Sequence, residues 1–153
     1  MTTTDRIERK GLIRAPRSRV WRALTNPTEF GEWFGAKLEG GFRPGQKTKG
    51  KITHPGYEDL TMDMTVDRME TEALFSYRWH PYAIDPKRDY SAETPTLVEF
   101  RLEEAKEGTW LTVVESGFDE IPTGRRVEAF RMNDKGWAEQ LKNIERYVDL
   151  VKQ

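Results

Sequence analysis

Apolar and polar side chains alternate along much of the region between residues 37 and 116, a pattern typical of β-strands with one buried face. In the clearest run, Leu60, Met62, Met64 and Val66 alternate with polar residues. The pattern predicts strands at residues 6–14, 37–42, 47–53, 58–69, 73–79, 96–104 and 109–116. Short connections, including two Pro-Gly turns, join most of these segments, so neighbouring strands should be antiparallel.

Two short helices are expected between the first and second strands. Ala15-Pro16 should end the first strand, because proline interrupts a strand and suits the first turn of a helix. The helix that follows has one apolar face, formed by Val20, Trp21 and Leu24. Asn26 has the side chain of an N-cap, and a second helix should run from it to about Trp33.

The C-terminal region has the period of an amphipathic helix, with apolar residues at Trp137, Leu141, Ile144, Val148 and Val151. This helix should begin near Thr123, with a break or kink at Asn133-Asp134. Its apolar stripe can be buried on the concave face of a large antiparallel sheet. The order of elements predicts an α+β fold, β-α-α-β6-α, in which a curved seven-stranded antiparallel sheet wraps around the long C-terminal helix. We expect a single domain over residues 1–153.

Composition narrows the class of protein further. Charged residues make up 33% of the chain, yet five Trp, five Tyr and seven Phe supply the large side chains that a disordered chain lacks. The formal net charge of −1 provides no field to attract nucleic acid or an anionic membrane. No apolar run approaches a membrane span, and the first ten residues lack a signal-peptide pattern. We therefore expect a cytoplasmic protein without nucleic-acid partner or membrane insertion.

The chain lacks most of the residues on which common catalytic and metal sites depend. It has no cysteine, and its two histidines, His54 and His80, each precede a proline. No hydrolase or zinc-protease motif is present. The glycine-rich stretch 40–48 differs from a phosphate-binding loop, because Gln46 separates Gly45 from Lys47 and a strand follows. We expect neither a metal nor a cofactor, and the sequence assigns no catalytic residue.

Bulky side chains gather on the inward positions of the predicted strands and helices. Any one of them can be ordinary core, but a single helix about 10 Å wide does not fill the concave side of a seven-stranded sheet. Either side chains fill the remaining space or a hydrophobic cavity is left. The candidate ligand-binding residues are Trp33, Phe34, Met62, Met64, Phe75, Tyr77, Trp79, His80, Phe100, Glu115 and Trp137. The long segment 80–95 is a candidate lid.

Glu115 shares a strand face with the apolar residues Leu111 and Val113. On the inner face its carboxyl group would need a partner, or burial would raise its pKa and allow it to act as an acid or a base. The simpler interpretation is an Arg or Lys partner, or exposure at the end of the strand. The same choice, between a functional role and a simply paired or exposed side chain, applies to Arg78 and His80, which follow the inward aromatic run.

Several segments resemble one known family. They are the opening motif Ile13–Pro27, the aromatic strand Phe75–Trp79, the Gly-Thr-x-Leu-Thr and Ser-Gly-Phe motifs within Gly108–Phe118, and Gly-Trp-x-x-x-Leu at Gly136–Leu141. In this order they resemble the family named for the activator of heat-shock protein 90 ATPase homologue, within the START-like (SRPBCC) superfamily. The resemblance implies a helix-grip fold, with a long C-terminal helix over a hydrophobic cavity.

Three functions remain open at this point. The first is binding of a small apolar, aromatic or lipid-like molecule in the cavity. The second is a cavity enzyme of cyclase or hydrolase type, with Glu115, His80 or Tyr77 transferring a proton. The third, which the family resemblance implies, is a chaperone co-factor or another protein-interaction module. A homodimer is compatible with each of them.

Overall fold

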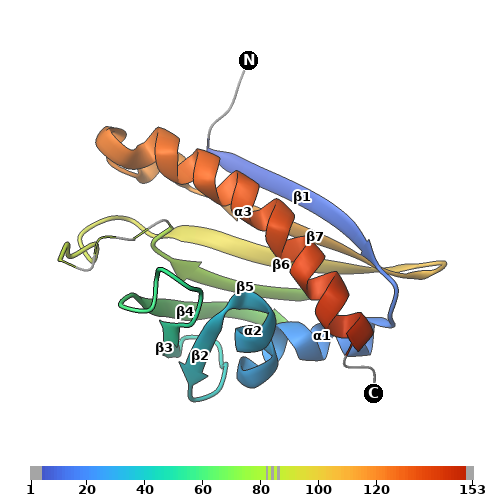
Figure 1. Cartoon of the computed structure of the whole chain (residues 1–153). Helices are drawn as coiled ribbons and strands as arrows, with labels where there is room; N and C mark the ends of the chain where they lie inside the picture. Colours follow the sequence, from blue (N-terminus) through green and yellow to red (C-terminus); the bar gives the residue numbers. More distant parts are fainter. Residues whose placement is uncertain (1–4, 82, 84, 86, 151–153) are drawn as a thin grey trace.

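One antiparallel sheet is the framework of the molecule (Figure 1). The computed structural model describes residues 5–81, 83, 85 and 87–150. The strands of the sheet are β1 (Arg6–Ile13), β2 (Ala36–Glu39), β3 (Lys47–Ile52), β4 (Thr61–Glu70), β5 (Leu74–Trp79), β6 (Thr96–Ala105) and β7 (Gly108–Ser116). The helices are α1 (Arg17–Thr25), α2 (Pro27–Phe34), the short 3₁₀ helix η1 (Phe118–Glu120) and α3 (Thr123–Leu150).

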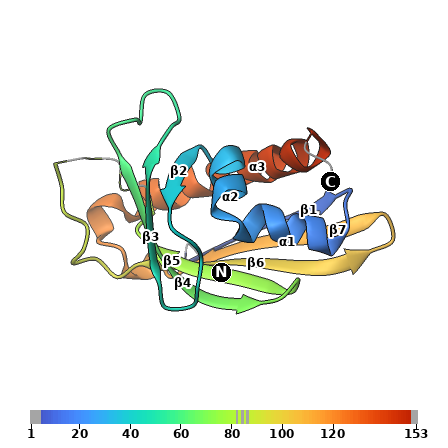
Figure 2. The same cartoon turned by 90° about the horizontal axis from the view of Figure 1, so that it is seen from below.

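The strands lie in the order β1-β7-β6-β5-β4-β3-β2. Each strand from β2 to β6 pairs with its successor, whereas β1 pairs with β7, with Arg6 opposite Ser116. The chain therefore crosses the sheet from one edge to the other between β1 and β2, and α1 and α2 make this crossing. Figure 2 shows α1, α2 and α3 on the same side of the curved sheet. The predicted α+β helix-grip arrangement is confirmed.

The boundaries of α2 follow from its end residues. Asn26 Oδ1 accepts a hydrogen bond from the Glu29 backbone N–H (3.1 Å), so Asn26 is the predicted N-cap. At the other end Gly35 adopts φ 97°, a left-handed conformation that favours glycine, and its N–H donates to the Gly31 carbonyl. The chain turns sharply here into β2. This turn brings Trp33 and Phe34 to the end of the helix, above the concave face.

The sequence predicts a break or a kink at Asn133-Asp134, but the long helix α3 is continuous there, so the break is wrong. Both polar side chains have partners on the sheet: Asn133 bonds to Glu115, and Asp134 accepts a hydrogen bond from Arg9 (3.0 Å). They therefore do not compete with the hydrogen bonds of the helix backbone. Trp137, Ile144 and Val148 are buried in the predicted stripe and Leu141 is half-buried, while Val151 lies outside the described residues.

Two predicted strands are shorter than the sequence pattern suggests. β2 ends at Glu39 rather than residue 42, because Gly40 turns the chain at φ 87°. β4 begins at Thr61 rather than residue 58, because the Leu60 N–H donates to the Tyr57 carbonyl and closes a turn.

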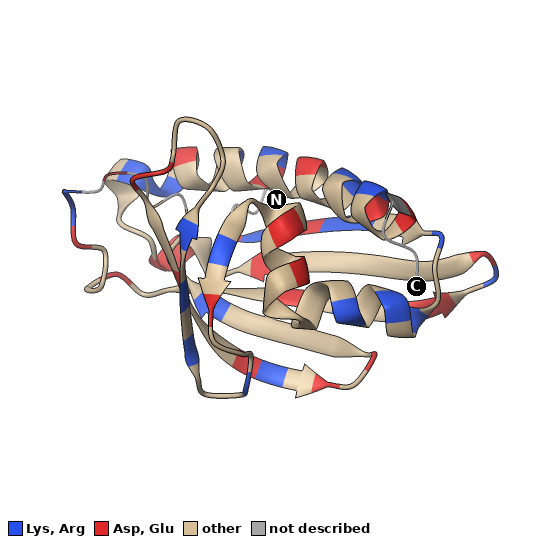
Figure 3. Cartoon of the chain, turned by 60° about the horizontal axis from the view of Figure 1, so that its bottom comes forward, with Lys and Arg blue, Asp and Glu red and all other residues tan. Residues whose placement is uncertain are grey.

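Figure 3 shows Lys and Arg interspersed with Asp and Glu over the helices and strands that it displays. Within the described residues, no helix is long and apolar enough to cross a membrane.

Candidate functional site

A cluster of aromatic rings lies between the concave face of the sheet and the helices. α2 contributes Phe30, Trp33 and Phe34, while β5, β6 and α3 supply the others, Phe75, Tyr77, Trp79, Phe100 and Trp137. Ring centroids of neighbours lie 4.6 to 6.3 Å apart, for example 5.9 Å between Trp79 and Trp137. The sheet, α2 and α3 thus share one packed aromatic interior, which we call the aromatic cluster.

The structure brings most of the predicted site residues into or beside this cluster. Met62 and Met64 of β4 are buried in the same core. Phe30 belongs to the cluster and is fully buried, yet it is missing from the predicted set. The spacing of Phe30, Trp33 and Phe34, which places them on neighbouring positions of one helix, is the signal that would have found it.

Glu115 is fully buried, and its carboxyl group accepts four hydrogen bonds from neutral donors. Oε1 accepts from Asn133 Nδ2 (2.9 Å) and Trp137 Nε1 (2.8 Å). Oε2 accepts from Trp79 Nε1 (2.8 Å) and Thr96 Oγ1 (2.6 Å). No Arg or Lys among the described residues forms a salt bridge with it. The simpler interpretation of the sequence, a basic partner or an exposed position, is therefore wrong.

These four donors join three parts of the fold at one carboxyl group. Trp79 ends β5, Thr96 begins β6, and Asn133 and Trp137 lie one turn apart on α3. Glu115 thereby holds α3 against the sheet and fixes the orientation of two indole rings of the aromatic cluster. A carboxylate has about four lone-pair sites, and all of them are used here.

Burial raises the pKa of Glu115 above its ordinary value of 4.5, and the four hydrogen bonds oppose this shift without cancelling it. A raised pKa means that the folded protein holds this proton more tightly than the unfolded chain does. The stability that Glu115 contributes is therefore complete below the unfolded pKa and is lost as pH rises through the folded pKa.

We expect this loss to disappear in Glu115→Gln, which cannot titrate. The unfolding free energy of the wild type should fall relative to that of the variant as pH rises from 4.5. Urea denaturation of both proteins at a series of pH values measures the difference. Glu93 changes the stability with pH in the opposite direction, because its hydrogen bond with Arg125 lowers its pKa. The stability that Glu93 contributes is therefore lost as pH falls below 4.5. A difference that stays constant with pH would contradict the raised pKa of Glu115.

The Tyr77 hydroxyl is the polar atom of the cluster without a partner. Tyr77 is fully buried on β5, and its hydroxyl has no hydrogen-bond partner among the described residues. Burial, and secondarily the negative charge of Glu115, raise the pKa of this phenol well above its ordinary value. The hydroxyl is therefore neutral and able to donate or accept a hydrogen bond.

His80 is engaged elsewhere. Its Nε2 donates to the Glu93 carbonyl (2.8 Å) within the segment 80–95. Arg125, near the start of α3, fixes the same segment with hydrogen bonds to the Glu93 carboxylate and to the Pro81 carbonyl (2.9 Å). His80 thus contributes to anchoring this segment, and a role of residues 80–95 as a lid stays a prediction.

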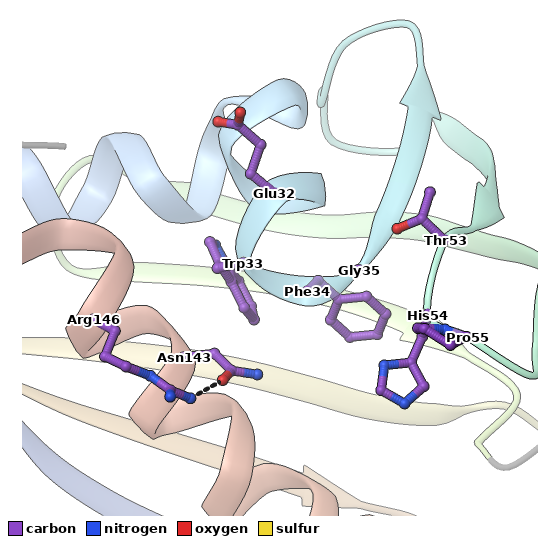
Figure 4. A pocket seen from close by; sticks show the side chains of 9 residues that line it. All are labelled: Glu32, Trp33, Phe34, Gly35, Thr53, His54, Pro55, Asn143 and Arg146. Atoms are coloured by element: carbon purple, nitrogen blue, oxygen red, sulfur yellow. Dashed lines mark hydrogen bonds between the residues drawn. The ribbon is translucent and has the colours of Figure 1, made fainter. Parts of the chain in front are cut away.

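Two hollows open beside the aromatic cluster. The smaller, of about 360 Å³, lies where the end of α2, the end of β3 and α3 meet (Figure 4). The larger, of about 770 Å³, lies between the ends of β4 and β5 and the segment 80–95, and includes Met62, Trp79 and His80 in its walls. Phe34 lines both. The predicted site residues Met64, Phe75, Tyr77, Phe100, Glu115 and Trp137 line neither of these two hollows.

Neither of these two hollows is the predicted internal cavity, which stays a prediction. The rings of α2 and of the strands occupy the concave face, and each of the two hollows is open to solvent. Phe34 lies in the wall of both hollows and contacts Trp79, with ring centroids 5.8 Å apart. Among the described residues, no three His, Asp or Glu side chains converge as a metal site would require.

Residues 14–149 match the family described as "Activator of Hsp90 ATPase homolog 1-like protein". The chain belongs to this family. It therefore has the START-like fold of the family, as the element order and the sheet topology also show. No curated protein matches the chain significantly.

Solved structures agree on the fold. Protein MLL2253 from Mesorhizobium loti is 24% identical with a TM-score of 0.75, over 97% of this chain and 99% of that one. NE0264 from Nitrosomonas europaea is 17% identical with a TM-score of 0.77, over 98% and 97%. The Aha1 dimer from Colwellia psychrerythraea is 17% identical with a TM-score of 0.71, over 97% and 98%. At these identities the likeness concerns the fold alone.

Proposed function

We propose that this family member binds a small, largely apolar ligand, aromatic or lipid-like, against the aromatic cluster. The observation that carries the proposal is the buried Tyr77 hydroxyl without a partner. Leaving such a group unsatisfied costs about 1–3 kcal/mol, so native structures rarely keep one. A ligand with one polar atom at this point and an apolar body around it would supply the missing hydrogen bond.

The route to Tyr77 runs past Phe34. This ring is half-buried at the end of α2, where Gly35 turns the chain, and it stacks on Phe30 with centroids 5.2 Å apart. Rotation of the Phe34 side chain would join the hollows to the interior beside Trp79 and Tyr77, whose rings are 5.4 Å apart. Aromatic walls with few polar groups are typical of small-molecule sites, and folds of this family commonly bind ligands.

The test is Tyr77→Phe with two probes of the same shape, 2-naphthol and naphthalene. The wild type should bind 2-naphthol about five- to tenfold more tightly than naphthalene, because only 2-naphthol has a hydroxyl group that can pair with Tyr77. The variant should lose this preference, retain its affinity for naphthalene, and unfold at the same or a higher temperature. Equilibrium dialysis measures the affinities, and a thermal melt measures the stability.

Tyr57→Phe is the matched control, because Tyr57 is an exposed tyrosine on the wall of the larger hollow. It should leave the preference for 2-naphthol unchanged. Failure of both probes to bind the wild type would overturn the proposal. Equal loss of the preference in the two variants would place the probe in the outer hollow instead of the aromatic cluster.

An enzyme in which Glu115, His80 or Tyr77 transfers a proton has less support. All lone-pair sites of Glu115 are used by its four donors, so it has none to offer a substrate. His80 is bound to the segment 80–95, and the phenol of Tyr77 is neutral over the whole ordinary pH range. The geometry therefore favours binding over catalysis.

A chaperone co-factor is the second candidate, because the family carries the name of an Hsp90 ATPase activator. A similar structure, the Aha1 of Colwellia psychrerythraea, is a dimer, so a homodimer of this chain belongs to the same candidate. Stimulation of the ATPase of purified Hsp90 by this protein, together with its mass in solution, tests this function independently of any small ligand.

A further inference from the structure

The smaller hollow carries a basic group at one side and aromatic rings at the other. Figure 4 shows the guanidinium of Arg146 and the side chain of Asn143 on one side, and the rings of Phe34 and His54 on the opposite side. Trp33 lies between them. At about 360 Å³ the hollow is within the range of small-molecule sites, which starts near 300 Å³.

A directed chain of hydrogen bonds holds the guanidinium in this position. Arg146 Nη2 donates to Asn143 Oδ1 (2.7 Å), Asn143 Nδ2 donates to Gln140 Oε1 (2.9 Å), and Gln140 Nε2 donates to the Phe34 carbonyl (3.2 Å). A guanidinium can only donate and a carbonyl can only accept, so neither amide can be flipped. The chain therefore ties Arg146 to the end of α2 and leaves most of its N–H groups unused by these bonds.

No carboxylate neutralises Arg146 among the described residues. None of the salt bridges found there includes it. Glu32 also lines the hollow, but its carboxylate accepts a hydrogen bond from the Tyr147 hydroxyl (2.8 Å) and points away from His54 and Asn143 (Figure 4). The local charge on the side that faces Phe34 is thus positive, next to apolar rings.

We infer that this hollow receives the acidic end of the ligand, so that the ligand class is an aromatic or acyl carboxylate. This rests on the proposed function, because the apolar body of the same molecule would extend past Phe34 into the aromatic cluster. A carboxylate matches the forked N–H groups of a guanidinium, and a charge-assisted bond of this kind is about twice as strong as a neutral one. The Asn143 side chain keeps the guanidinium oriented for it.

The experiment compares 2-naphthoate with 2-naphthamide, which has the same shape and no charge. Isothermal titration calorimetry of the whole chain should show about tenfold tighter binding of the naphthoate to the wild type, and this preference should shrink as salt is added. Arg146→Gln should reduce the affinity for naphthoate about tenfold and that for naphthamide less than twofold.

Arg131→Gln is the matched control, since it removes the same charge from an exposed position of α3, about 22 Å along the helix. It should leave both affinities unchanged. The inference is overturned if the naphthoate binds no better than the naphthamide, or if both arginine variants weaken it equally. In either case binding of 2-naphthol and its dependence on Tyr77 would still support the proposed function, whereas failure of every naphthalene probe would overturn that function itself.

Discussion

Glu115→Ala is expected to lower the free energy of unfolding by about 3 kcal/mol or more. The substitution leaves four donors without their acceptor: two indole N–H groups, an amide and a hydroxyl. Each buried donor left unpaired costs about 1–3 kcal/mol, and release of the buried carboxyl group offsets only part of the sum. Urea denaturation at neutral pH, followed by circular dichroism, measures the change.

Glu115→Gln should cost less, about 1–2 kcal/mol, because the amide keeps one acceptor oxygen. It cannot satisfy the site fully, since each carboxylate oxygen accepts from one indole, Trp79 or Trp137, and an indole N–H cannot accept from an amide. Glu103→Ala is the control, because Glu103 is exposed on β6 and its loss should change stability by about 0.5 kcal/mol at most. A loss in Glu115→Ala no larger than in Glu103→Ala would show that the four hydrogen bonds do not stabilise the fold.

The same hydrogen bonds make Glu115 a positioning residue. Its buried carboxyl group accepts from β5, β6 and α3 at once and fixes the positions of two indole rings. One of these rings, Trp79, contacts Phe34. The protonation state of Glu115 therefore acts on the shape of the aromatic cluster. It would change the affinity for a ligand in the aromatic cluster, even though the ligand does not contact the carboxyl group.

Much of the fold follows from local patterns in the sequence. The alternation around Met62 and Met64 predicts β4 with its buried face, Asn26 predicts the start of α2, and the apolar stripe from Trp137 predicts the buried side of α3. Each of these signals depends on residues that are close in the sequence. A local pattern is enough to show which side of an element becomes buried.

The site is less predictable, because its partners converge from distant parts of the chain. The sequence places Glu115 on an apolar face but does not show that Trp79, 36 positions away, and Trp137 donate to it. The predicted break in α3 fails for the same reason: Asn133 has a partner on β7 that no local rule reveals. The smaller hollow likewise joins His54 to Arg146, which lie 92 positions apart in the sequence.

Gly31→Ala is expected to lower the free energy of unfolding by about 3 kcal/mol. A Cβ atom at this buried position of α2 would lie 2.2 Å from the Ala36 carbonyl oxygen, and backbone atoms cannot yield as a flexible side chain does. The clash falls where α2 turns through Gly35 into β2, so α2 must shift away from β2 and carry Phe34 with it. Urea denaturation measures the stability, and the affinity for 2-naphthol should fall together with it.

Gly136→Ala is the matched control, because it is the same substitution in a helix with the opposite surroundings. A Cβ atom on Gly136 meets nothing within 4 Å, so the variant gains the helix propensity of alanine, about 0.5–1 kcal/mol, without a clash. Changes of opposite sign in the unfolding free energies of the two variants would show that the close approach of α2 and β2 determines the effect at Gly31, rather than the low helix propensity of glycine. Stabilisation by Gly31→Ala would contradict the close contact between α2 and β2, and with it the position of Phe34 on which the proposed route to Tyr77 depends.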